Sequence, residues 1–75
     1  MRIKPDYAAA YNNLGNIFKE KGDKELAIKN YKLAIKLKPN YAEYHNNIGI
    51  IYKENNNIDF AKQSFKQAIS LKSDY

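Results

Sequence analysis

The sequence predicts an all-α fold of two tandem helix-turn-helix hairpins, four antiparallel helices in all, forming a short segment of α-solenoid. Three observations predict it. Residues 5–38 (the first unit) and 39–72 (the second unit) align at a shift of 34 with 15 identical positions, and such a period is typical of repeat proteins. Apolar residues in each unit recur at the spacing of amphipathic helices. Turn-forming residues separate these stretches.

The first unit contains two helix patterns. Its first apolar stripe consists of Ala8, Tyr11, Leu14, Gly15 and Phe18. The "KGD" at residues 21–23 ends this helix, because Gly22 suits the left-handed residue after a helix and Asp23 suits the cap of the next. The second helix is expected from about Lys24 to Leu37, where Pro39 stops it.

The second unit repeats this plan, with helices expected over about Tyr41 to Glu54 and Ile58 to Leu71. Asn56 stands where the first unit has Gly22, and asparagine is the next most tolerant residue for a left-handed backbone. Small residues mark the places where helices must approach closely, namely Gly15, Ala27 and Ala34. Each unit is therefore expected to pack as a small-against-large hairpin.

Composition narrows the class of protein. The 75 residues suffice for one small domain, and there is no cysteine for a disulfide or a thiolate metal site. The chain has neither the apolar run of a signal peptide nor 18 consecutive apolar residues, so a cytoplasmic protein with no membrane partner is expected. The net charge of +5 comes from residues 1–38, which hold nine basic and four acidic residues against four and four in residues 39–75.

The repeated positions resemble the tetratricopeptide repeat family. The residues that carry the resemblance are Tyr11, Leu14, Gly15, Phe18, Ala27, Tyr31, Ala34 and Pro39, repeated as His45, Ile48, Gly49, Tyr52, Ala61, Phe65 and Ala68. The phrases "NNLGN" and "KEKGD" are similar to the repeat arrays of O-linked N-acetylglucosamine transferases. The resemblance implies a single module, residues 1–75, with repeats over about 8–41 and 42–75 after the tail of a preceding repeat at 1–7.

In this family the first helices of successive repeats line a concave groove. On a helical wheel the asparagines of the first helix lie roughly 100–200° from Tyr11, away from their own hairpin. The resemblance therefore implies a groove that binds an extended peptide or protein segment through Asn12, Asn13, Asn16, Asn46, Asn47 and Ile50. A carboxamide offers two donors and two acceptor lone pairs, which suits a peptide backbone. The alternative is that these asparagines only keep an exposed face soluble.

The sequence shows no set of residues that would form a catalytic site, so the chain is not expected to be an enzyme. No cofactor is expected, and no metal either, because Gly49 stands where a second ligand to the one histidine, His45, would be at i+4. Lys29, Lys32 and Lys36 gather on the outer side of the second helix. They indicate a solvated face, since no aromatic residues interleave to stack bases; binding of RNA or an acidic protein is the weaker alternative, and nucleic acid is not an expected partner.

The phrases "IKPDY", "LKPNY" and "LKSDY" repeat one joint, so we interpret the chain as a segment of a longer array or as a two-unit building block made on that template. Apolar residues of the last helix would then present surface to a neighbour: Phe60, Phe65, Ile69 and Leu71. The alternative function is self-assembly of the segment as a homo-oligomer, either by end-to-end stacking or by exchange of helices between chains.

Overall fold

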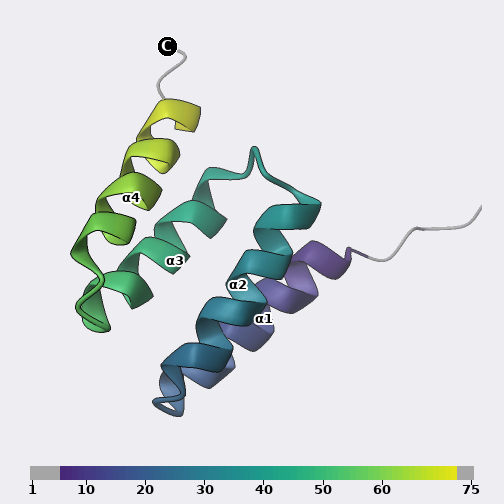
Figure 1. Cartoon of the computed structure of the whole chain (residues 1–75). Coiled ribbons are helices and arrows are strands. Elements are labelled where there is room, and N and C mark those ends of the chain that lie inside the picture. The colour runs from purple at the N-terminus through teal and green to yellow at the C-terminus, as the bar shows by residue number, and fades with distance from the viewer. Residues whose placement is uncertain (1–5, 73–75) are drawn as a thin grey trace, which may run out of the picture.

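The computed structural model describes residues 6–72, and these residues form four helices (Figure 1). The helices are α1 (Tyr7–Glu20), α2 (Lys24–Leu37), α3 (Ala42–Glu54) and α4 (Ile58–Lys72). The predicted all-α fold of two hairpins is confirmed, and the bounds of α2 are the predicted ones. The start of α3 and the end of α4 each lie one residue beyond the prediction.

Local sequence signals fix where the helices begin and end. Asp6 and Asp23 cap α1 and α2, each accepting a hydrogen bond from the backbone N–H three residues later. Gly22 follows α1 with φ of 83°, and Asn56 follows α3 with φ of 64°. Both residues adopt the left-handed backbone that glycine and asparagine tolerate best, as the sequence predicts.

Each hairpin closes at a glycine. A Cβ added at Gly15 would lie 2.5 Å from Cε1 of Tyr31, and one added at Gly49 would lie 2.7 Å from Cε1 of Phe65. The glycines therefore let an aromatic ring of the second helix lie directly against the backbone of the first. This confirms the predicted close approach of α1 to α2, and α3 approaches α4 in the same way.

Two clusters of buried apolar residues lie where the two hairpins meet. The helices pack in sequence order, α1 on α2, α2 on α3 and α3 on α4 (Figure 1). Ala27 and Tyr31 of α2 pack with Ile48 and Ile51 of α3. A second cluster joins Tyr44 of α3 to Ala8 and Ala34 of the first hairpin. These clusters join the two units, and the contacts at Gly15 and Gly49 close each hairpin.

Leu14 belongs to the predicted apolar stripe of the first helix, but the structure does not bury it. Leu14 is 40% exposed, whereas the equivalent Ile48 is 3% exposed. The difference arises because Ile48 faces α2, while no helix of the described residues covers the corresponding side of α1. None of the helices in residues 6–72 has the length and apolar character needed to cross a membrane.

Candidate protein-interaction surfaces

A hydrogen bond between two asparagines joins the first helices of the two units. The side-chain amide of Asn47 on α3 donates to Oδ1 of Asn12 on α1, with 3.0 Å between nitrogen and oxygen. Asn12 is only 6% exposed and Asn47 is half-buried. This bond links α1 to α3 and brings one carboxamide of each unit into contact.

Asn16 contributes to its own hairpin. Its Oδ1 accepts a hydrogen bond from the hydroxyl of Tyr31, which is fully buried. Burial raises the pKa of Tyr31, and the charge of Glu54 raises it further, so the phenol stays protonated and able to donate. The expectation that all these asparagines face away from their own hairpin is therefore wrong for Asn16.

The remaining residues of the predicted groove are more accessible. Asn13 and Asn46 are exposed, and Ile50 is half-buried. The structure thus divides the predicted set in two. The side chains of Asn12 and Asn16 are hydrogen-bonded inside the molecule, and the amide of Asn47 donates to Asn12. Asn13 and Asn46 present their carboxamides to solvent.

The last helix borders an apolar hollow of about 660 Å³ between α3 and α4. Its lining residues are Ala42, Glu43, Asn46, Phe65, Ala68, Ile69 and Lys72. Two of the predicted self-association residues, Phe65 and Ile69, therefore meet at this hollow. The other two do not line it: Phe60 packs its ring 5.4 Å from that of Tyr52, and Leu71 is half-buried.

Sequence reasoning missed a second apolar patch, on α1. Ile17 is 48% exposed and lies one turn from Leu14, with Ala10 also exposed on this side. The signal was the repeat itself, because the equivalents of these residues are Tyr44, Ile48 and Ile51, which α2 and its neighbours bury. Comparing the two units position by position would have marked this side of α1 as an interaction surface.

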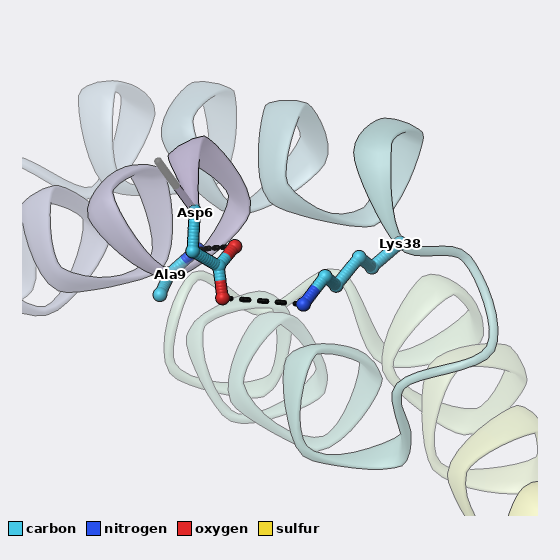
Figure 2. A network of polar contacts seen from close by, with 3 residues as sticks. All are labelled: Asp6, Ala9 and Lys38. Carbon is cyan, nitrogen blue, oxygen red and sulfur yellow. Dashed lines mark hydrogen bonds and ion pairs between the residues drawn. The ribbon is translucent and has the colours of Figure 1, made fainter. Parts of the chain in front are cut away.

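An ion pair links the two ends of the first hairpin (Figure 2). Nζ of Lys38, which follows α2, lies 3.1 Å from Oδ2 of Asp6, whose other oxygen accepts from the backbone N–H of Ala9. The Ala9 hydrogen bond and then the Lys38 ammonium lower the pKa of Asp6, and Asp6 raises the pKa of Lys38. Both side chains are about half exposed, so solvent screens the pair and its contribution to stability is small.

The other charged or ligating candidates do not gather into a site. Lys29, Lys32 and Lys36 are all exposed. His45 is half-buried, and its Nε2 lies 2.7 Å from the carbonyl oxygen of Pro39, which fixes the ring beside the joint between the units. Within residues 6–72 there is no cluster of three His, Cys, Asp or Glu side chains that could hold a metal ion.

Two family models match the chain. A model of the TPR repeat matches residues 15–56, and a model of the tetratricopeptide repeat matches residues 42–75. A stretch of 35 residues is 49% identical to the probable UDP-N-acetylglucosamine–peptide N-acetylglucosaminyltransferase SEC of Arabidopsis thaliana. That match covers 47% of this chain and 4% of the transferase, so it concerns a repeat fragment.

A solved structure has the same architecture. The crystal structure of MamA superposes with a TM-score of 0.85 at 31% sequence identity, over 89% of this chain and 39% of MamA. The chain thus spans well under half the length of either similar protein. Tetratricopeptide repeats generally mediate interactions between proteins rather than catalysis. The period of the sequence, the paired hairpins and the matching family models together establish that this chain belongs to the tetratricopeptide repeat family.

Proposed function

We propose that the chain is a non-enzymatic interaction module that binds an extended peptide or protein segment along the asparagine surface of α1 and α3. The observation that supports this proposal is the Asn47–Asn12 hydrogen bond, because it brings a carboxamide of each unit into contact. The proposed surface consists of the predicted residues, some of which contact the ligand while others position the helices: Asn12, Asn13, Asn16, Asn46, Asn47 and Ile50.

Within this surface the residues have different tasks. Asn12 and Asn16 position the helices, since their side chains bond to Asn47 and Tyr31. Asn13 and Asn46 are exposed and offer both a donor and an acceptor to a ligand. Half-buried Ile50 adds one apolar contact. A surface with these groups would recognise the backbone amides of a peptide more than its side chains.

Geometry sets the length of ligand that would fit. Packed helices lie about 8–10 Å apart, and an extended chain advances about 3.3 Å per residue. Equivalent carboxamides of the two units therefore match backbone groups roughly three residues apart. A peptide of about six to nine residues would engage both units.

The test uses an immobilised library of random nine-residue peptides, probed with protein dilute enough to be monomeric. Peptides that bind the chain should lose affinity by about tenfold or more in Asn13→Ala plus Asn46→Ala, because two exposed hydrogen-bonding groups are lost. The matched control is Asn40→Ala, an exposed asparagine outside the surface. N-methylation of the bound peptide backbone should also abolish binding.

Two results would sink the proposal. One is a set of binders whose affinity does not change in the double variant. The other is an equal loss in Asn40→Ala, since the contact would then lie elsewhere. Circular dichroism of each variant confirms that the helices are retained.

A second candidate function is self-association, and the hollow beside α4 favours it. Ile69 in its lining is 68% exposed and Phe65 lies beside it, and exposed apolar surface of this kind marks association sites in soluble proteins. Sedimentation equilibrium over about a hundredfold range of concentration tests it. A mass that stays that of the monomer throughout excludes this candidate without affecting the peptide proposal.

A further inference from the structure

The hollow beside α4 has a counterpart inside the molecule. Shifted by 34 positions, its lining residues correspond to Ala8, Ala9, Asn12, Tyr31, Ala34, Ile35 and Lys38 of the first unit. In the first unit α3 packs on this surface, which we call its seat. Tyr31 and Ala34 are fully buried there, and Asn12 is nearly so. The hollow is therefore the same kind of helix seat, repeated one unit further along the chain.

The helix face that fits such a seat is also present twice. On α3 it consists of Tyr44, Ile48 and Ile51, all 4% exposed or less. The equivalent residues of α1 are Ala10, Leu14 and Ile17, which are exposed. The first unit thus has an accessible face on α1 and the second an accessible hollow beside α4. Figure 1 shows α1 and α4 as the two outer helices of the array.

We propose that α1 of a second copy of this chain docks in the hollow beside α4, so that copies associate head to tail. This proposal rests on self-association, the second candidate function, and names its geometry. Leu14 and Ile17 of one copy would pack against Phe65 of the next, as Ile48 and Ile51 pack with Tyr31 within the chain.

The asparagines supply a polar contact that fixes the register. Asn47 donates to Asn12 across the junction of the two units. The equivalents of this pair are Asn13 on the α1 face and Asn46 in the hollow, both exposed. Docking would place the amide of Asn13 against Oδ1 of Asn46 of the second copy, and so extend the same row of hydrogen bonds from one copy to the next.

Three substitutions make the contact between copies weaker than the internal junction. Ala10 stands where α3 has Tyr44, so the aromatic anchor of the internal junction is lacking. Exposed Lys62 stands where the first unit has half-buried Ile28. Glu43 in the hollow replaces Ala9. Association is therefore expected to depend strongly on concentration rather than to give a permanent dimer.

This geometry is heterologous, because the face and the seat are different surfaces of the same molecule. A contact of this kind has a property that a two-fold symmetric dimer lacks. A variant with a disabled face keeps an intact seat, and a variant with a disabled seat keeps an intact face. A mixture of the two variants therefore contains one intact face and one intact seat. The two populations should then pair, although neither associates by itself.

The test uses Ile17→Lys to disable the face and Ile69→Lys to disable the seat. Both side chains are about half or more exposed and lie in the last turn of their helix, where a cation is tolerated. Leu37→Lys is the matched control, since Leu37 is 52% exposed in the last turn of α2 and lines neither surface. Leu14→Lys is a second face variant, and circular dichroism verifies the helical content of each.

Sedimentation equilibrium should show that the wild type and Leu37→Lys gain mass with concentration. Each single variant should lose at least tenfold in association constant. An equimolar mixture of Ile17→Lys and Ile69→Lys should regain association but stop at one copy of each, because both remaining ends are disabled. Asn13→Asp removes the amide donor and should weaken association several-fold. Asn46→Asp retains an oxygen that can accept the hydrogen bond, so its association should be weakened less.

Two outcomes overturn the inference and are distinguishable. A wild type that is monomeric at every concentration removes both self-association and the head-to-tail geometry. A wild type that associates, with Ile17→Lys unaffected or with no recovery in the mixture, leaves self-association standing and removes the docking of α1. The peptide library experiment uses dilute protein, so neither outcome alters its result.

Discussion

At the residue scale, Asn12 and Asn46 occupy the same position in two similar units but have different surroundings. Asn12 is 6% exposed and bonded to Asn47, whereas Asn46 lies at an open surface. The difference is due to α3, which covers the first unit. A residue's contribution to stability therefore depends on whether the next helix lies over it.

Replacing Asn12 by alanine tests this dependence. The amide of Asn47 would lose its acceptor at the junction of the units, and leaving such a group unpaired costs about 1–3 kcal/mol. Asn46→Ala, the matched change in the second unit, should alter the free energy of unfolding by no more than about 0.5 kcal/mol. Urea denaturation followed by circular dichroism measures both; equal effects would contradict the assigned roles.

The glycines offer a similar comparison. A Cβ at position 15 would press on Tyr31, which is fully buried and bonded to Asn16. Overpacking typically costs about 1–3 kcal/mol and the gain in helix propensity returns about 1. We expect Gly15→Ala to destabilise the chain and Gly49→Ala to cost less, because Phe65 is only half-buried at an open surface and can move. Denaturation midpoints of the two variants measure the difference, and the reverse order would refute this account.

At the scale of the helices, the sequence could predict most of what is observed. The spacing of apolar residues, the caps and the turn residues Gly22 and Asn56 are local signals, and they place α2 to the residue. What a single helix cannot reveal is which neighbour lies over it. The wheel placed Leu14 on the buried face and the asparagines on a free one, yet Leu14 is exposed and Asn12 is buried.

The capping aspartate of α1 makes stability depend on pH. The Ala9 hydrogen bond and Lys38 lower the pKa of Asp6 below its usual value of 3.8. A carboxyl group with a lowered pKa in the folded state adds stability above its unfolded pKa and loses it as the pH falls through the folded pKa. We therefore expect acid unfolding below about pH 4 to be less steep in Asp6→Asn, which keeps a capping oxygen but carries no charge.

Thermal unfolding at a series of pH values measures this effect. Lys38→Met serves as a control, because it removes the ion pair but leaves the Ala9 hydrogen bond. Its pH dependence should lie between those of the wild type and Asp6→Asn. Identical profiles for all three proteins would show that Asp6 has the same pKa in the folded and unfolded states.

At the scale of the whole molecule, the most deeply buried side chains of residues 6–72 lie on the two inner helices, α2 and α3. The side chains with no exposure belong to Ala27, Tyr31 and Ala34 of α2 and to Ile51 of α3. Among the described residues, the three most exposed large apolar side chains lie on the outer helices: Ile69, Tyr7 and Phe60. Sequence reasoning predicted that the ends would be apolar, but only the arrangement of helices shows that the first unit has an accessible face and the second an accessible seat.

Hydrogen exchange should report this distribution. In dilute protein, the backbone amides around Tyr31 and Ile51 should exchange most slowly, because they open only when the junction of the units is lost. The amides in the last turns of α1 and α4 should exchange faster. Uniform protection along all four helices would instead indicate a single cooperative unit with no weaker ends.

The pair of Tyr31 and Asn16 has a consequence for how such repeats evolve. The second unit has Phe65 and Ile50 at these positions, so a hydrogen-bonded pair in one unit corresponds to an apolar pair in the other. Changing only one member would leave a hydroxyl or a carboxamide without its partner in a close-packed hairpin. These two positions should therefore covary among the repeats of related arrays, even though they are 15 positions apart in the chain.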